Sequence, residues 1–193
     1  MDDRDGETAV RAARAAAEAE TEGRRADIRF PASFSERKGV FVTISEHPSG
    51  VLRGCVGYPE PRLSLGEALL SSAAAACHDA RFPDLTPEEA SRCTFSVTVL
   101  TAPMEMNSTS PEDLMSKIKI GRDGLMIDLH GRRGLFLPQV PVEWNWNATE
   151  YLARLSLKAG LRRDAWTNPE AKISSFQGEV FSEVSPRGGI KRE

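Results

Sequence analysis

The chain has no excess of basic residues and no long apolar run. Its 193 residues contain 25 Lys and Arg against 28 Asp and Glu, which gives a net charge of −3 at pH 7. A broad nucleic-acid-binding surface normally requires a basic face, so this balance argues against one. No apolar run approaches the length of a membrane span, and the charged start Met1–Arg4 is not typical of a signal peptide. We therefore expect a cytoplasmic protein that does not enter a membrane.

Cysteine and histidine are both scarce. The three cysteines are Cys55, Cys77 and Cys93. Their odd number, their wide spacing and the lack of a Cys-x-x-Cys motif argue against a disulfide framework. The three histidines are His47, His78 and His130, and no helical His-x-x-x-His or Glu-x-x-His pair is present. A structural zinc site is therefore not expected, and we predict neither a metal nor a cofactor. A three-ligand site assembled from distant residues stays open.

Residues 1–57 predict one helix and one hairpin. Residues 7–22 are rich in Ala, Arg and Glu, which favour helix, but they contain little large apolar surface. We expect this helix to lie on a surface rather than to form a core. Along residues 40–44 the aliphatic side chains of Val40, Val42 and Ile44 alternate with Phe41 and Thr43, which is typical of a strand. The turn at 46–50 then leads into a second strand at 51–57, so the two strands should pair as a hairpin.

Capping residues mark further helices along the chain. Helix starts are predicted at Ser64, Thr86, Ser110 and Asn147, each followed three residues later by an acidic residue. Strands are predicted at 95–99, 125–129, 135–140 and 176–184, and a flexible polar tail at 185–193. Hairpins interspersed with helices indicate an α+β fold with a mostly antiparallel sheet flanked by helices.

The strand Val51–Gly57 contains the most reactive combination of residues. Alternate side chains of a strand share a face, so Arg53 and Cys55 should project together, roughly 6–7 Å apart. A thiol beside a fixed positive charge ionises more easily, and the thiolate is the reactive form. Gly54 and Gly57 remove side chains, which allows a ligand or another backbone to approach closely. Simple packing is the alternative, because free cysteine is often a buried space-filling residue.

Several motifs resemble the AMMECR domain family. They are Gly39–Ile44, Leu52–Gly57, Asp79–Pro83, Gly134–Gln139, Lys158–Leu161 and Asp164–Trp166. The match runs in order over about residues 30–183. The resemblance implies an α+β fold of two unequal lobes with a cleft between them, the larger lobe formed by both chain ends. It divides the chain into an N-terminal helix and connection (1–29), the AMMECR-type domain (30–184) and the tail (185–193).

The resemblance fixes no biochemical activity. In prokaryotes, genes of this family often lie beside, or are fused to, genes for a Memo-type protein and a radical-SAM enzyme. These proteins are therefore the partners that the resemblance implies. Eukaryotic relatives have been suggested to serve basic information-processing machinery, without a defined reaction. Whether this chain is an enzyme stays open at this point.

Two functional hypotheses follow. In the first, the chain is an enzyme or a substrate-handling subunit in which Cys55 is the nucleophile or covalent carrier. Arg53 would lower the thiol pKa or bind an anion, while Asp79 and Arg81 orient Arg53 or the substrate. The Asp79–Arg81 pair is alternatively a simple ion pair at a helix end. Gln139 suits substrate recognition, or else satisfies exposed backbone groups. In the second hypothesis the chain is a non-catalytic adaptor that binds a peptide, a partner enzyme or RNA.

Overall fold

The computed structural model describes residues 1–193 and divides them into two compact units. Unit 1 consists of Met1–Leu100 and Glu179–Glu193, and unit 2 consists of Thr101–Gly178. No helix in either unit is long and apolar enough to cross a membrane. Each unit has its own sheet and its own hydrophobic core. The predicted α+β class with antiparallel sheets flanked by helices is confirmed, while a cleft between two lobes stays a prediction.

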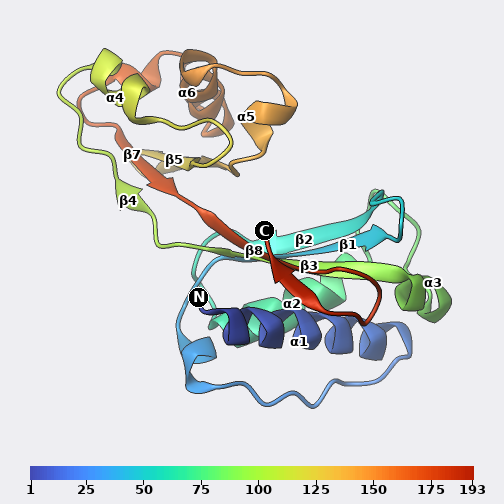
Figure 1. Ribbon diagram of the computed structural model, residues 1–193. Helices are drawn as coiled ribbons and strands as arrows, with labels where there is room; N and C mark the ends of the chain where they lie inside the picture. The colour runs from blue at the N-terminus through green and yellow to red at the C-terminus, as the bar shows by residue number, and fades with distance from the viewer. The chain divides into compact units, whose positions relative to one another are not determined.

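Unit 1 is a five-stranded sheet with both of its long helices on one face (Figure 1). The strand order is β2-β1-β3-β8-β9, so β2 lies at an edge. Its elements are α1 (Asp3–Thr21), a 3-10 helix (Ala32–Ser35), β1 (Val40–Glu46), β2 (Leu52–Tyr58), α2 (Leu65–Ala76), α3 (Pro87–Arg92), β3 (Cys93–Leu100), β8 (Gly178–Glu183) and β9 (Ile190–Arg192). The predicted antiparallel hairpin of residues 40–44 with 51–57 is confirmed.

Period-2 alternation explains how this sheet divides its residues between two faces. Val40, Val42 and Ile44 of β1 are fully buried against the helices, and the alternate residues Phe41 and Thr43 are only partly buried. The same alternation continues in β3, which pairs with β1 along its whole length. The second face, which holds Phe41 and Thr43, faces away from α1 and α2, and we call it the helix-free face.

Helix α1 contributes to the core, so the expectation that it would lie on a surface was wrong. Ala9, Ala13 and Ala17 are fully buried. Small side chains let a helix axis approach its neighbour closely, and α1 packs against α2 on this alanine face. A Cβ atom on Gly6 would lie 2.2 Å from the Phe181 ring, which shows how near this helix comes to β8. Burial here depends on close fit rather than on large apolar residues.

Unit 2 is a four-stranded antiparallel sheet in the order β4-β7-β5-β6. Its elements are β4 (Met104–Glu105), α4 (Pro111–Lys117), β5 (Gly124–Leu129), β6 (Arg132–Phe136), α5 (Val140–Glu143), α6 (Ala148–Lys158), a 3-10 helix (Ala165–Thr167) and β7 (Lys172–Phe176). Helix α6 covers the sheet with Leu152 and Leu155, and the buried Tyr151 donates its hydroxyl to the Asp123 carbonyl oxygen at 3.2 Å.

Three boundaries differ from the sequence-based expectations. The strand expected at 176–184 is two strands, because Gln177 pairs with Thr101 through two hydrogen bonds and the chain then leaves the sheet of unit 2 for that of unit 1. The strand expected at 135–140 ends at Phe136, and α5 follows with a proline in its first turn. The expected tail contains β9, whose residues 190–192 pair with β8.

Candidate functional site

Cys55 lies at the centre of the edge strand β2, where its backbone is bound from outside the sheet. Its N–H donates to Oδ2 of Asp79 at 2.9 Å, and its carbonyl oxygen accepts from Nη2 of Arg81 at 3.3 Å. An edge strand leaves a row of backbone groups unpaired, and here two side chains replace the missing neighbour. We call this Asp79–Arg81 arrangement the clamp.

The clamp is held together by its own ion pair. Arg81 donates from Nε to Oδ1 of Asp79 at 3.0 Å and from Nη2 to Oδ2 at 2.6 Å, which is bidentate geometry. These hydrogen bonds, together with the N–H groups of Cys55 and Arg81, outweigh burial and hold the Asp79 pKa far below its usual value. Asp79 is buried, whereas the Arg81 side chain is about half exposed. The carboxylate therefore stays ionised and is a poor proton acceptor at neutral pH.

The thiol of Cys55 projects from the helix-free face. Cys55 is paired with Thr43 in the register of β1 and β2, and Thr43 Oγ1 donates to Cys55 Sγ at 3.2 Å. The side chain is partly buried, in contrast to the buried Cys77 and Cys93. The clamp and the Thr43 hydroxyl together fix the position of a side chain that remains partly exposed.

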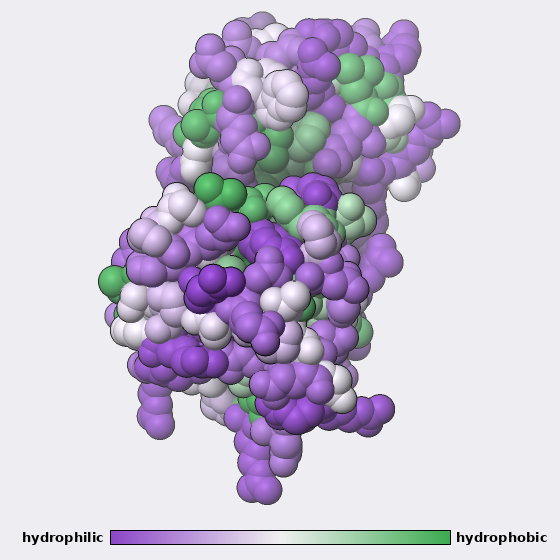
Figure 2. Space-filling model, turned by 90° about the vertical axis from the view of Figure 1, so that its right-hand side faces the viewer, coloured by the Kyte–Doolittle hydropathy of each residue, from purple (hydrophilic) through white to green (hydrophobic).

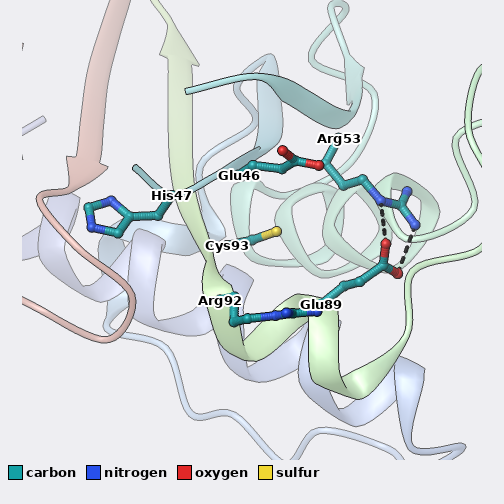
Figure 3. A pocket seen from close by; sticks show the side chains of 6 residues that line it. All are labelled: Glu46, His47, Arg53, Glu89, Arg92 and Cys93. Atoms are coloured by element: carbon teal, nitrogen blue, oxygen red, sulfur yellow. Dashed lines mark hydrogen bonds and ion pairs between the residues drawn. The ribbon is translucent and has the colours of Figure 1, made fainter. Parts of the chain in front are cut away.

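Arg53 points away from this thiol, which corrects the expectation that the two side chains share a face. The pairing of β1 with β2 shifts after Ile44, so Arg53 is the extra residue of a β-bulge. Its guanidinium donates to Glu89 of α3 from Nε at 3.2 Å and from Nη2 at 3.0 Å (Figure 3). Nη2 also donates to the Asp84 carbonyl oxygen at 3.1 Å. Glu89, rather than Asp79, therefore orients Arg53.

Arg53 lines a separate pocket at the end of the β1–β2 hairpin. This pocket has a volume of about 260 Å³ and is lined by Glu46, His47, Arg53, Glu89, Arg92 and Cys93 (Figure 3). Two carboxylates oppose two guanidinium groups, so the charges of the lining nearly balance. Burial raises the pKa of the Cys93 thiol, which keeps it protonated there. Cys55 does not line this pocket. Arg53 therefore does not take part in the chemistry that the sequence suggested for the Cys55 thiol.

The two glycines of the motif have packing roles. A Cβ atom on Gly54 would lie 2.2 Å from the carbonyl oxygen of Ala76 at the end of α2, and one on Gly57 would lie 2.3 Å from the carbonyl oxygen of Val40. Both contacts are with backbone atoms, which cannot move aside as a flexible side chain does. The close approach of another backbone therefore explains why glycine stands at both positions. That Gly54 and Gly57 also contact a ligand stays a prediction.

Replacing Gly54 by alanine is expected to destabilise unit 1 by about 1–3 kcal/mol, because the added methyl group must push α2 away from β2. Chemical denaturation followed by far-ultraviolet circular dichroism measures the change. Gly189→Ala is the matched control, because Gly189 has neither a positive φ nor an atom within 4 Å of its Cβ position. Equal stability of Gly54→Ala and wild type would contradict the close contact.

The loop between α2 and α3, which carries the clamp, is also held by His78. Its Nε2 lies 3.2 Å from Glu20 at the end of α1, and its Nδ1 lies 3.0 Å from Asp84. The hydrogen bonds to Asp84 and Glu20 raise the pKa of His78 above its usual value. Because the folded-state pKa is raised, the protonated ring contributes stability below the unfolded-state pKa, and this is lost as the pH rises through the folded-state pKa.

Replacing His78 by glutamine is therefore expected to cost stability at about pH 5.5, below the unfolded-state pKa, and to cost progressively less as the pH rises through the raised folded-state pKa. The side chain is about half exposed, so solvent screening limits the difference to a fraction of a kcal/mol. Thermal melts of both proteins across this range measure it. A difference that is constant with pH would show that the ring acts only through packing.

Gln139, the remaining candidate, belongs to unit 2. It precedes α5, its side chain is exposed, and its carbonyl oxygen accepts from Val142 and Glu143. Sequence reasoning missed Thr43 and Glu89 as neighbours of the motif. Glu89 was recognised as a helix-capping residue, and the structure confirms the capping box with Thr86. Thr43 gave no signal of its own beyond its place opposite the motif in the predicted hairpin.

Comparisons with known proteins agree with this fold. The AMMECR1 family model matches residues 9–181. Protein MJ0810 of Methanocaldococcus jannaschii is 46% identical over 188 residues, which cover 96% of this chain and 94% of that protein. A protein of Thermofilum pendens is 46% identical over 169 residues, which cover 83% and 79% of the two chains.

A solved structure supports the same assignment. The crystal structure of the uncharacterized protein PH0010 from Pyrococcus horikoshii superposes with a TM-score of 0.82 at 40% identity. The match covers 100% of this chain and 98% of that one. The resemblance found in the sequence motifs is thereby confirmed. This chain belongs to the AMMECR1 family.

Proposed function

We propose that this protein is a cytoplasmic substrate-handling subunit that presents the Cys55 thiol on the helix-free face of unit 1. The observation that carries the proposal is the clamp: Asp79 and Arg81 bind both backbone groups of Cys55 and leave its side chain accessible. A merely space-filling cysteine needs no such fixation. The thiol would contact the substrate or carry it covalently, in a system that includes a Memo-type protein and a radical-SAM enzyme.

The surroundings of Cys55 favour a subunit over a self-contained cysteine hydrolase. A hydrolase of that kind needs an imidazole beside the thiol. The group that forms a hydrogen bond to Cys55 Sγ is instead the Thr43 hydroxyl. Asp79 cannot replace the imidazole, because its oxygens accept from Arg81 and Cys55 and its pKa is strongly lowered. Chemistry at this thiol would therefore need a group supplied by the substrate or by a partner.

The non-catalytic adaptor remains the second candidate. The hydrogen bonds of Arg53 favour it. Arg53 was expected to bind an anionic substrate, but its guanidinium already donates to Glu89 and to the Asp84 carbonyl oxygen. In an adaptor, Cys55 would be one contact among several. Covalent change at the thiol separates the two candidates.

The test is a pull-down of the tagged chain with the Memo-type and radical-SAM proteins of its own source, followed by mass spectrometry of the Cys55 peptide. A substrate-handling subunit is expected to co-purify with at least one of them and to carry added mass on Cys55, which Arg81→Gln should reduce. Glu7→Gln, at an exposed position of α1, serves as the control. Co-purification that is unchanged in Cys55→Ala, without added mass, favours the adaptor. No association with either protein contradicts the proposed partners.

A further inference from the structure

Unit 2 carries a tryptophan that its own fold leaves largely exposed. Trp144 caps the C-terminus of α5 with 68% of its surface accessible, whereas Trp146 packs edge-on against Phe136 at 5.4 Å between ring centroids. The rings of Trp144 and Trp146 stack at 6.3 Å with an interplanar angle of 21°. Trp144 therefore has support on one ring face only, while Trp146 is anchored in the core.

The turn between these tryptophans is conformationally specific. Asn145 has a φ of 51°, in the left-handed region that few residues other than glycine and asparagine adopt readily. Its N–H donates to the Val142 carbonyl oxygen at 3.1 Å, and the Trp146 N–H donates to the Pro141 carbonyl oxygen at 2.8 Å. This reversal sends Trp146 toward the core and leaves Trp144 outside. The exposure of Trp144 is therefore fixed by the backbone.

Two further exposed apolar side chains belong to the same region as Trp144. One lies two residues earlier in the chain, and the other lies in the loop that contacts it. Val142 is 56% exposed and Ile120 is 39% exposed. Val142 Cγ2 lies 3.2 Å from the Cβ position of Gly121, so the loop after α4 runs beside α5. We call Ile120, Val142 and Trp144 the tryptophan patch. On the face shown in Figure 2, hydrophobic residues of each unit reach the surface among hydrophilic ones. Exposed apolar groups rimmed by polar residues are typical of interaction sites.

The charges around this patch favour an anionic partner. Lys119, next to Ile120, is exposed and forms no ion pair, and Lys158 Nζ lies 4.3 Å from the Phe136 ring centroid without a carboxylate partner. Arg154 lies over Trp146 at 5.8 Å. Of the nearby carboxylates, Glu150 forms ion pairs with Arg154 and Arg163, whereas Glu143 forms no ion pair. The two cations without an ion-pair partner, Lys119 and Lys158, therefore outnumber the one unpaired carboxylate, Glu143.

We propose that the tryptophan patch docks a short peptide segment of a partner protein. An apolar anchor of that segment packs on Trp144 and Val142, and acidic residues beside the anchor pair with Lys119 and Lys158. A nucleic acid fits less well, because residues 101–178 contain ten Lys and Arg against nine Asp and Glu, and a phosphate backbone needs a continuous basic track. The docking site lies on unit 2 and does not involve Cys55, so it stands independently of the proposed function.

The test is selection from a random peptide display library on the full-length chain, followed by titration of the enriched peptides. Wild type is expected to enrich segments that combine an aromatic or aliphatic anchor with Asp or Glu. Trp144→Ser should weaken their binding on the order of thirtyfold, as loss of a central aromatic anchor does. Lys158→Gln should weaken it a few-fold, and high salt should abolish that difference.

Met104→Ser is the matched control, because Met104 is 73% exposed on β4, at the other edge of the sheet from β6. It should bind like wild type, and thermal melts should show that all variants fold. The proposal is overturned if no acidic apolar segment is enriched, if Trp144→Ser and Met104→Ser bind such peptides as wild type does, or if single-stranded oligouridylate binds this patch more tightly than the peptides.

Discussion

Replacing Glu183 by alanine is expected to lower the free energy of unfolding of unit 1 by about 3–5 kcal/mol. Glu183 is buried, and its carboxylate accepts from Arg14 Nε at 2.6 Å, from Arg14 Nη2 at 2.5 Å and from the Phe95 N–H at 3.0 Å. Burial opposes the charge of Arg14, and Glu183 and Glu18 together raise its pKa against that opposition. A guanidinium does not lose its proton in a protein, so without Glu183 the charge of Arg14 stays buried and keeps only Glu18 as a carboxylate partner. The pair ties α1 to β8 and β3.

Hydrogen exchange at the backbone amides of β1, the strand between β2 and β3, measures this loss, because the Phe95 amide loses its own acceptor in this variant. All three tryptophans lie in unit 2, so their fluorescence reports on that unit and should change little. The double variant Arg14→Met, Glu183→Met should lose less stability than Glu183→Ala, because it leaves no buried charge unpaired. The exposed pair of Arg11 and Glu7 is the control, and Arg11→Gln should cost less than about 1 kcal/mol. A loss of similar size in Glu183→Ala would contradict the account.

Cys55 is expected to react with a thiol alkylator near neutral pH well before Cys77 and Cys93. Burial raises the pKa of Cys77 to about 12 and also raises that of Cys93. At Cys77 the shift from the ordinary value of 9.0 lowers the thiolate fraction by about a thousandfold, and burial limits access as well. Cys55 is the cysteine that the fold leaves partly exposed.

Limited alkylation followed by peptide mapping checks this order. In denaturant the three thiols should label at similar rates, which serves as the control for intrinsic reactivity. Equal labelling of all three in the folded protein, or labelling of Cys93 first, would show that Cys55 is shielded and would remove the basis for a functional thiol.

The hairpin and the helix starts were predictable because their signals are local. Alternation over residues 40–44 and the turn at 46–50 predict the β1–β2 pair, and side chains such as Ser64 and Thr86 cap helices that begin one residue later. Each depends on residues only a few positions apart. Local periodicity and capping therefore account for most of the elements and for the antiparallel pairing of the motif strand.

The orientation of the motif residues was not predictable in the same way. A strand without a bulge would place Arg53 and Cys55 on one face, but the extra residue in β2 turns Arg53 toward Glu89. Gly54 carried a usable signal, because glycine inside a strand often marks a bulge. The clamp depends on a contact between residues 24 positions apart, Cys55 and Asp79, and local patterns contain no information about it.

The functional role of Cys55 is tested most directly by Cys55→Ser, read by thermal melting beside complementation of a deletion strain. Because the side chain is partly exposed and Thr43 can donate to a serine oxygen, the melting temperature should stay within about 2 °C of wild type. The account predicts wild-type melting with failed complementation, while Cys77→Ala, which removes a thiol facing the core, still complements. A lowered melting temperature that tracks the loss of function, or full complementation by Cys55→Ser, would contradict a functional thiol at this position.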